Sequence, residues 1–480
     1  MSARFVGRKR ELDALRLLTR KRGASLVVIT GRRRIGKSRL IDEFAARNAR
    51  YRRVFISALA PGRGITPATQ RAAFAEQLQL ALELPQLRTA SWFDLFVHLA
   101  RGTERGRWLI LLDEVSWMGS RSPDFLPKLK ILWDQYLSKN PQLILVLCGS
   151  VSSWLDENIL ASTGFVGRVS LSLRVDELPL NDCNAFWGGV GERISAYDKL
   201  KLLAVTGGVP RYLEEIVAGE SADENLRRLC FTPEGLLFRE FDQIFSALFD
   251  RRASIYRDIV DALGDGHLTL QQLCDRLRRQ KGGAMSRYLD ELTLAGFVSR
   301  DFTWDIRRRI ESKLSRFRLK DNYLRFYLRQ VRPNRRRIEA RRMKPLPVTA
   351  IPGWDAMMAL QFENLVLHNR EAIWHRCGVS ASEIELDGSY FQSTTKRQRG
   401  CQVDYLIQTV HGPLYVCEIK YSRKRLGRAV EDAVREKIRR LALPRHCSVL
   451  PVLVHVGEVS ESIGTGDFFA RVVDFTELLT

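Results

Sequence analysis

The sequence contains no long apolar run, and its cysteines are scattered. No uninterrupted apolar stretch in the 480 residues approaches the ~18 residues that a membrane-spanning helix needs. The segment Met1–Leu12 lacks the apolar core of a signal peptide. The eight cysteines include no C-x-x-C pair, which argues against both a disulfide framework and a zinc cluster. These absences predict a protein of the reduced cytoplasm with no membrane partner.

Acidic residues are scarce relative to basic ones. Asp and Glu number 55 against 77 Lys and Arg, which gives a net charge of +22 and a pI near 10. Such an excess predicts a polyanionic partner, nucleic acid first and an anionic membrane second, although a solvated basic surface would give the same composition. The chain is too long for one hydrophobic core, so about three domains are expected.

The segment Ser25–Leu40 carries the clearest motif. Leu26–Ile29 is a short apolar run typical of a buried strand, and it leads into G-x-x-x-x-G-K-S, from Gly31 to Ser38. The glycines let backbone N–H groups surround a phosphate, Lys37 adds a positive charge, and the Ser38 hydroxyl is a ligand for Mg²⁺. A chance match is a weak alternative, because a strand is expected before the motif and a helix after it. The pattern predicts binding of a nucleoside triphosphate.

Two further apolar segments end in polar residues. Trp108–Leu112 is followed by Asp113 and Glu114, and Leu143–Leu147 leads to Ser150. Carboxylates at a strand tip are typical of a Walker B segment, in which Asp113 would hold Mg²⁺ and Glu114 would polarise the attacking water. Ser150 would sense the γ-phosphate. The alternation of strands and helices predicts a parallel α/β sheet with ligands at the carboxyl ends of its strands.

Several motifs of the N-terminal half occur in a fixed order: FVGRKREL, GRRRIGKS, LLDE, CGS, a Gly-Arg pair and GGVPRYL. They resemble the prokaryotic, archaeal-type P-loop ATPases of the AAA+/STAND assemblage. The resemblance implies that ATP is the cofactor, that Ser150 is sensor 1 (where Asn is common) and that Arg211 is a sensor-2-like group in a helical lid. Arg168 is either a finger onto a neighbour's phosphate, which implies a homo-oligomer, or a strand-edge arginine paired with Asp or Glu. The implied nucleotide site comprises Val6 and Gly7 near the adenine, Gly31, Arg32, Arg33, Arg34, Ile35, Gly36, Lys37, Ser38, Arg39, Asp113, Ser150, Arg168 and Arg211.

Residues 254–330 have a different pattern. Three helices are expected, followed by a basic hairpin: Ile255–Leu263, Leu270–Leu277, Ala284–Ala295 and a hairpin containing Arg307–Arg309. This order resembles a winged helix, in which Ser286 and Arg287 would face the major groove and the hairpin arginines would contact phosphate. A docking domain between subunits is the alternative, and the basic hairpin favours DNA.

The last part of the chain, from Gly353, contains a second group of charged residues. Glu363 lies in the expected helix Trp354–Asn369, Asp404 in a strand over 402–407, and Glu418 and Lys420 in a strand over 414–421. Residues two apart on a strand share a face, so Glu418 and Lys420 point the same way, and a hairpin brings Asp404 to them. Clustered carboxylates repel one another, so we expect a divalent cation to bind between them and offset their charge.

This spacing, D-x(13)-E-x-K with an upstream helical Glu, resembles the PD-(D/E)XK nuclease superfamily and the restriction-endonuclease-like domain at the C-terminus of the same ATPase family. The resemblance implies that Asp404 and Glu418 hold Mg²⁺, with Mn²⁺ as a substitute, and that Lys420 orients water or stabilises charge. Glu363 would assist a first or second ion. The alternative is an amphipathic hairpin with its charges on the solvent face. The expected catalytic residues are therefore Glu114, Glu363, Asp404, Glu418 and Lys420.

We therefore expect an α/β protein with a P-loop ATPase core of AAA+ type over 1–180, a helical lid over 181–250, a winged-helix domain over 251–333, a basic linker over 334–352 and a PD-(D/E)XK nuclease-like domain over 353–480. The predicted function is an ATP-hydrolysing, DNA-acting protein in which the nucleotide state controls DNA engagement or cleavage. A second hypothesis is a nucleotide-controlled DNA-binding or signalling switch whose nuclease-like domain does not cut. A protein-remodelling ATPase is a third, but it leaves the positive charge unexplained.

Overall fold

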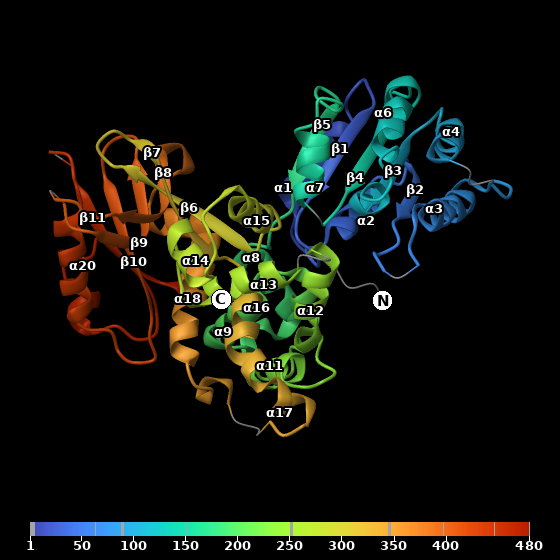
Figure 1. Ribbon diagram of the computed structural model, residues 1–480. Coiled ribbons are helices and arrows are strands. Elements are labelled where there is room, and N and C mark those ends of the chain that lie inside the picture. Colours follow the sequence, from blue (N-terminus) through green and yellow to red (C-terminus); the bar gives the residue numbers. More distant parts are fainter. Residues whose placement is uncertain are drawn as a thin grey trace. The chain divides into compact units, whose positions relative to one another are not determined.

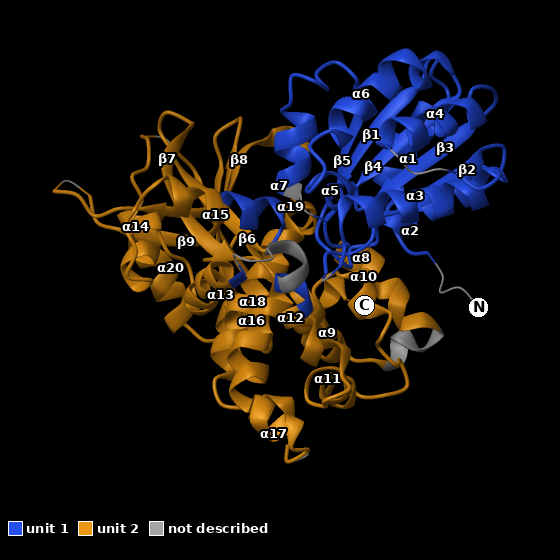
Figure 2. Cartoon of the chain, turned by 45° about the vertical axis from the view of Figure 1, so that its right-hand side comes forward, with its two compact units in different colours: residues 1–178, 243–253, 290–296 blue, residues 179–242, 254–289, 297–480 orange. Residues whose placement is uncertain are grey.

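The computed structural model describes residues 5–62, 64–87, 91–150, 152–249, 253–343, 347–396, 398–445 and 447–479. The chain forms two compact units, shown in two colours in Figure 2. The first unit comprises residues 1–178, 243–253 and 290–296, and the second comprises residues 179–242, 254–289 and 297–480. Within the described ranges, no helix combines the length and the apolar content that crossing a bilayer requires.

The first unit is built on a parallel sheet of five strands in the order β2-β3-β4-β1-β5 (Figure 1). The strands are β1 (Ser25–Thr30), β2 (Arg52–Ser57), β3 (Trp108–Asp113), β4 (Leu143–Cys148) and β5 (Val169–Arg174). Every residue of β1 and β4 is buried, as expected for central strands of a parallel sheet. The predicted parallel α/β sheet is confirmed. The edge strand β5 was not predicted, because its Ser residues alternate with apolar ones and form no apolar run.

Helices accompany the sheet of the first unit, and an aromatic cluster joins three of them. The helices are α1 (Lys9–Leu18), α2 (Lys37–Arg47), α3 (Pro67–Leu82), α4 (Trp92–Gly102), α5 (Val115–Gly119), α6 (Phe125–Gln135) and α7 (Ser152–Leu155). The cluster joins α3, α4 and α6, and in it the ring of Trp92 lies 5.4 Å from that of Phe74 and 4.8 Å from that of Phe125. The helical pattern over residues 70–100 is divided between α3 and α4, because the hydroxyls of Thr66 and Ser91 each accept an N–H and begin a separate helix.

Helices dominate the first half of the second unit. They are α8 (Leu180–Cys183), α9 (Ala196–Thr206), α10 (Pro210–Leu213), α11 (Ala222–Cys230), α12 (Leu236–Phe249), α13 (Ala253–Ala262), α14 (Leu270–Arg276), α15 (Gly283–Leu294), α16 (Asn322–Phe326) and α17 (Arg335–Glu339). The last residues of α12 and α15 belong to the first unit. The expected order of three helices and a hairpin is present as α13, α14, α15 and the strands β6 (Val298–Asp305) and β7 (Ile310–Leu319).

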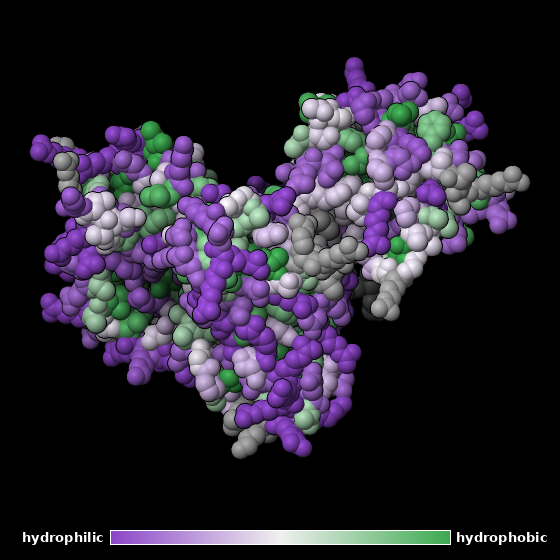
Figure 3. Space-filling model, in the orientation of Figure 1, coloured by the Kyte–Doolittle hydropathy of each residue, from purple (hydrophilic) through white to green (hydrophobic). Residues whose placement is uncertain are grey.

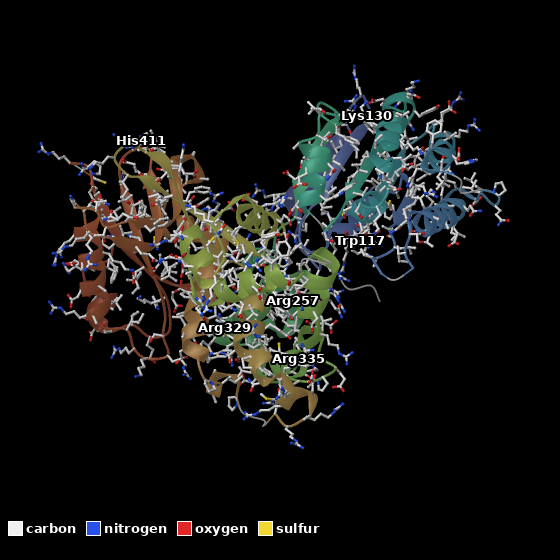
Figure 4. All side chains as sticks on the ribbon, in the orientation of Figure 1. Trp117, Lys130, Arg257, Arg329, Arg335 and His411 are labelled. Atoms are coloured by element: carbon white, nitrogen blue, oxygen red, sulfur yellow. The ribbon has the colours of Figure 1, made fainter. Side chains whose placement is uncertain are left out.

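The segment expected to be a basic linker begins as a helix. Arg335 of α17 lies 3.1 Å from Asp242 and 3.0 Å from Glu339, on the helical part of the second unit (Figure 4). The start of this segment therefore packs against α12. Lys344 and Pro345, which the linker prediction also included, lie outside the described residues.

The C-terminal part contains a mixed sheet in the order β12-β11-β10-β9-β8. Its strands and helices are α18 (Trp354–His368), α19 (Arg370–Cys377), β8 (Ile384–Gln392), β9 (Cys401–Thr409), β10 (Leu414–Tyr421), α20 (Ala429–Arg440), β11 (Val449–Val456), α21 (Glu461–Gly464) and β12 (Arg471–Asp474). The strands β8, β9 and β10 are antiparallel, whereas β10, β11 and β12 are parallel, and α20 forms the crossover between β10 and β11. The antiparallel pair β9–β10 was predicted, and β8, β11 and β12 were not.

The β6–β7 hairpin packs against this mixed sheet. The indole N–H of Trp304 donates to Gln408 at 2.8 Å, and the Trp304 ring lies 5.2 Å from that of Tyr390. Arg309 donates to Glu385 at 2.9 Å and to the Val410 carbonyl at 2.8 Å, and its expected contact with phosphate stays a prediction. The hairpin is therefore part of the C-terminal packing, and Arg309 is engaged within the chain.

Candidate functional site

The P-loop between β1 and α2 is shaped by two glycines. Gly31 has φ 145°, and a Cβ there would lie 2.4 Å from the Val175 carbonyl oxygen, so no larger residue fits. Gly36 has φ 88° and caps α2. The buried Lys37 ammonium donates to the carbonyls of Gly31 at 2.9 Å and Arg32 at 3.1 Å. The sequence thus places a cation inside a glycine-dependent turn at a helix start, an arrangement suited to phosphate.

The Walker A serine meets the Walker B aspartate. Ser38 Oγ donates to Asp113 Oδ2 at 2.6 Å, and Asp113 Oδ1 accepts the Glu114 N–H at 3.0 Å. The two residues come from α2 and from the end of β3, which the parallel sheet brings to one edge. A hydroxyl and a carboxylate oxygen this close together are a donor set that suits Mg²⁺. The predicted metal ligands Ser38 and Asp113 are therefore adjacent in the structure.

Glu114 and Ser150, which the sequence predicted as catalytic carboxylate and sensor, contact each other directly. Glu114 Oε2 accepts the Ser150 N–H at 2.9 Å and the Ser150 hydroxyl at 2.8 Å. Glu114 itself has φ 50°, a left-handed conformation that costs energy for a residue with a side chain. Its carboxylate is thus held at the carboxyl ends of β3 and β4, beside Asp113.

The segment before α1 is attached to the P-loop. The buried Arg8 guanidinium donates to the Ile35 carbonyl at 3.1 Å and to Glu11 at 3.2 Å. This contact ties the segment that carries Val6 and Gly7 to the phosphate loop, and their position near the adenine stays a prediction. Gly7 has φ 68°, consistent with a tight turn at this point.

The P-loop arginines have different surroundings. Arg32 is 5% exposed and lies 3.3 Å from Glu177, and Arg34, with φ 71°, donates to Gln243 at 3.3 Å. Arg33 and Arg39 are half-buried. Arg32 is therefore engaged within the chain, and a role of each of the four arginines at phosphate stays a prediction.

Arg168 and Arg211 both form ion pairs within the chain. Arg168 makes a two-bond pair with Asp134, at 2.6 Å and 2.9 Å, and this bonding lowers the pKa of Asp134 to about 2. Arg211, in the second unit, lies 2.6 Å from Glu215 and 3.5 Å from Glu214. The contact of Arg168 corresponds to the pairing alternative of the sequence analysis. Its role as a finger, and that of Arg211 as sensor 2, stay predictions.

The structure brings Asp404, Glu418 and Lys420 together on β9 and β10. Lys420 Nζ lies 2.8 Å from Glu418 Oε1, and Asp404 Oδ2 accepts the Ile419 N–H at 3.0 Å. Glu418 is only 1% exposed. The alternative of a hairpin with its charges on the solvent face is therefore wrong for Glu418. Burial and the neighbouring Glu418 carboxylate raise the pKa of Asp404.

Lys437 of α20 also belongs to this cluster and was not predicted. Its ammonium lies 2.5 Å from Glu418 Oε2 and 3.5 Å from Asp404 Oδ1, and these carboxylates raise its pKa against the effect of burial. A signal existed in the sequence. Lys437 lies three residues after the buried Val434, on the face of the helix that packs against the sheet.

Glu363, expected to assist a metal ion, lies beside this cluster and contacts a histidine. Glu363 Oε1 is 3.3 Å from His267 Nε2, in the segment before α14. Burial, followed by the charge of Asp404, raises the pKa of Glu363 to about 7. Burial and Arg318 lower the pKa of His267 to about 4. In the described part of the chain, no group of three or more His, Cys, Asp and Glu side chains is arranged to hold a metal ion. The proposed second site therefore has two carboxylates in place, those of Asp404 and Glu418. A role of Glu363 in assisting a metal ion stays a prediction.

Comparisons with known proteins match a large part of the chain. Residues 5–216 match the family described as an ATPase domain predominantly from Archaea. An uncharacterized protein of Methanocaldococcus jannaschii is 24% identical over 339 residues, 70% of each chain. Among solved structures, the Walker-type ATPase of Pyrococcus abyssi is similar with a TM-score of 0.51 and 18% identity, over 68% of this chain and 96% of that one. The ORC2 protein of Aeropyrum pernix has a TM-score of 0.43 and 16% identity, over 70% of this chain and 96% of that one. Residues 5–216 therefore match an ATPase domain in sequence. The similarity to the Pyrococcus abyssi structure supports a P-loop, AAA+-like fold.

Proposed function

We propose that this chain is an ATP-hydrolysing protein that acts on DNA, and that its C-terminal part is a Mg²⁺-dependent nuclease whose engagement depends on the bound nucleotide. The observation that carries the proposal is the convergence of Asp404, Glu418, Lys420 and Lys437 from β9, β10 and α20. Buried carboxylates are costly, and strongly perturbed titratable groups gather where chemistry is done.

In the ATPase domain, four residues bind the nucleotide and its metal ion or promote hydrolysis. Lys37 binds the outer phosphates, while Ser38 and Asp113 hold the metal ion. Glu114 orients the attacking water and accepts its proton, because Ser150 fixes one carboxylate oxygen and leaves the other for the water. Arg168 is proposed as a contact to a neighbouring copy in a homo-oligomer once its pair with Asp134 opens.

At the second site, Asp404, Glu418 and the Ile419 carbonyl would hold Mg²⁺ or Mn²⁺. The bound ion would supply Lewis-acid polarisation of the scissile phosphate. Lys420, 38% exposed, sits at the accessible side of Glu418, where its ammonium can orient water or stabilise developing negative charge. Lys437 neutralises the carboxylates from the other side.

DNA is the proposed polyanion for two reasons. The net charge of +22 favours a nucleic acid, and the order α13, α14, α15, β6, β7 suits a winged helix. In that arrangement Arg287 of α15 is exposed and Ser286 is half-buried. Their predicted contact with the major groove is part of this proposal.

A second function, the nucleotide-controlled DNA-binding or signalling switch, is favoured by one observation. Lys437 lies within 3.5 Å of both carboxylates, so their charge is compensated by the chain itself. A carboxylate cluster whose charge is balanced by the chain needs no metal ion, so this part of the protein would bind DNA without cutting it. It predicts nucleotide-dependent DNA affinity that falls steeply with salt, with no strand scission.

A metal titration separates the two functions. Calorimetry of the full chain with Mn²⁺ is expected to show a binding step that Asp404→Asn removes. The matched control is Asp432→Asn, which changes an exposed carboxylate of the same C-terminal part and should keep that step. If Asp404→Asn leaves the titration unchanged, the nuclease proposal fails and the switch is favoured.

A further inference from the structure

A hollow of about 620 Å³ opens beside the Asp404–Glu418 cluster, within the second unit. Its walls include Arg316 of β7, Gln392 of β8, Gln402 of β9, and Lys437 and Arg440 of α20. Lys437 lines the hollow and also contacts both carboxylates, so the hollow and the cluster share one residue. A volume of this size lies in the range of ligand sites.

Arg316 is fixed in this wall in an unusual way. Its guanidinium lies 4.2 Å from the Phe391 ring centroid, one amino group donates to Gln402 at 3.0 Å, and its Nε is buried without a hydrogen-bond partner. Stacking on an aromatic ring holds the planar group in one orientation. The remaining N–H groups of the two terminal nitrogens are left for a ligand, and a guanidinium offers them in a fork that matches a phosphate.

The hairpin that carries Arg316 is attached both to the mixed sheet and to α18. Thr303 donates to the Phe391 carbonyl at 2.5 Å, and Arg318, two residues along β7, pairs with Asp301 at 2.9 Å and donates to Asn364. Arg316 is therefore pre-positioned, and little side-chain freedom is lost when a ligand binds.

The charges around the hollow are predominantly positive. Arg316, Lys437 and Arg440 face it, and Glu436 is the acidic residue of its wall, paired with Arg440 at 2.9 Å. Gln392, Ser393, Thr394 and Gln402 add neutral polar groups. On the face of the second unit seen in Figure 3, hydrophilic residues predominate and apolar residues form small separate areas. This chemistry suits a phosphodiester chain rather than an apolar ligand.

We propose that this hollow binds the backbone of a single nucleic-acid strand next to the proposed metal site at Asp404 and Glu418, with Arg316 as the principal phosphate contact. The β6–β7 hairpin, which the sequence predicts as the phosphate-contacting hairpin of a winged helix, then forms a wall of the second site. The inference rests on the proposed function for the identity of the neighbouring site, although strand binding itself needs neither metal nor cleavage.

The test is fluorescence anisotropy of a labelled single-stranded DNA oligonucleotide with the full chain in EDTA, over a series of salt concentrations. Losing one phosphate contact lowers the slope of log K against log salt by about 0.7 for a single strand. Arg316→Gln is expected to weaken binding and lower the slope by this amount, and Arg316→Lys is expected to restore most of the slope. Lys313→Gln, an equal charge change at an exposed position of the same hairpin, should leave both unchanged.

Each outcome decides the proposal. It is overturned if Arg316→Gln binds as the parent does, or if Lys313→Gln loses as much affinity. Should Arg316→Gln fail to fold, Arg440→Gln on the opposite wall must lower the slope in its place. Competition by inorganic phosphate alone, at concentrations far below those at which other salts compete, would assign the hollow to a free phosphate and overturn strand binding. Because EDTA removes the metal, a protein that never cuts can pass this test, and a protein that cuts can fail it.

Discussion

Ser150 holds the Glu114 carboxylate with both its N–H and its hydroxyl, at 2.9 Å and 2.8 Å from the same oxygen. One residue at the end of β4 thereby fixes the orientation of a carboxylate at the end of β3. Hydrolysis should depend on this orientation more than nucleotide binding does, because Glu114 acts on the water and not on the nucleotide.

Removal of the Ser150 hydroxyl tests this relationship. Ser150→Ala keeps the N–H contact and loses one hydrogen bond to a charged group, which is worth about 1.5 kcal/mol or more. We expect kcat for ATP hydrolysis to fall about tenfold or more while the ATP affinity is kept. Ser120→Ala, an exposed hydroxyl at the end of α5, is the control. A drop in affinity with kcat unchanged would contradict the assigned role.

The two sites should be separable by mutation. Lys37→Ala removes the ammonium held within the P-loop and should reduce ATP turnover by about 10²-fold or more. Lys420→Ala should leave ATP turnover intact and remove nucleic-acid cleavage, since Lys420 pairs with Glu418 of the second site. Steady-state ATPase and cleavage assays on both variants check this. Loss of ATPase activity in Lys420→Ala with the fold intact would contradict two independent centres.

The buried Glu363 should make stability depend on pH. The folded protein, with a Glu363 pKa of about 7, keeps a proton that the unfolded chain releases near the ordinary value of 4.5. Ionisation therefore costs stability as the pH rises from 4.5 through 7, and the full cost is present above that window. Glu363→Gln cannot ionise. The free energy of unfolding of this variant, relative to that of the parent, should rise by on the order of 2 kcal/mol between about pH 5.5 and pH 8.

Denaturant unfolding at the two pH values measures this difference. His267, Arg318, Arg325 and Asp404 surround Glu363 and are present in both proteins, so the comparison isolates Glu363. A stability difference that stays constant with pH would show that Glu363 has an ordinary pKa.

Lys437 offers a test of the carboxylate cluster that does not involve activity. Lys437→Met leaves Asp404 and Glu418 without their closest cation, which should lower the free energy of unfolding by roughly 2 to 4 kcal/mol without metal. If the carboxylates bind a divalent cation, Mn²⁺ should restore much of this loss and raise the melting temperature of the variant more than that of the parent. Arg439→Met, exposed on the same helix, is the control. If the melting temperature of Lys437→Met is the same with and without Mn²⁺, the result would argue against a metal site.

The sequence predicted the parts whose chemistry is local. The P-loop needs glycines at fixed positions, and Gly31 and Gly36 have the positive φ angles that explain them. Likewise, alternation along β10 placed Glu418 and Lys420 on one face, as their 2.8 Å contact shows. Strands with mixed or unusual composition were missed: β11 contains Pro451, which usually argues against a strand between two others.

Contacts between distant segments could not be predicted. Lys437 reaches Glu418 because α20 crosses over the sheet, and Glu363 of α18 meets His267, which lies far away in the chain in the segment before α14. The docking of the β6–β7 hairpin likewise depends on the pairing of Trp304 with Gln408, which are far apart in the chain. The periodicity of a sequence predicts which face of a helix or strand is buried, but it does not predict which other element packs against that face.

A cleavage assay tests the central claim most directly. The parent protein, Asp404→Asn and Lys37→Ala should each be incubated with single- and double-stranded DNA and RNA, with Mg²⁺ or Mn²⁺, and with or without ATP. The account predicts metal-dependent strand scission by the parent, none by Asp404→Asn, and an altered dependence on ATP in Lys37→Ala. A pure parent protein that binds DNA but cuts none of these substrates under any of these conditions would contradict it.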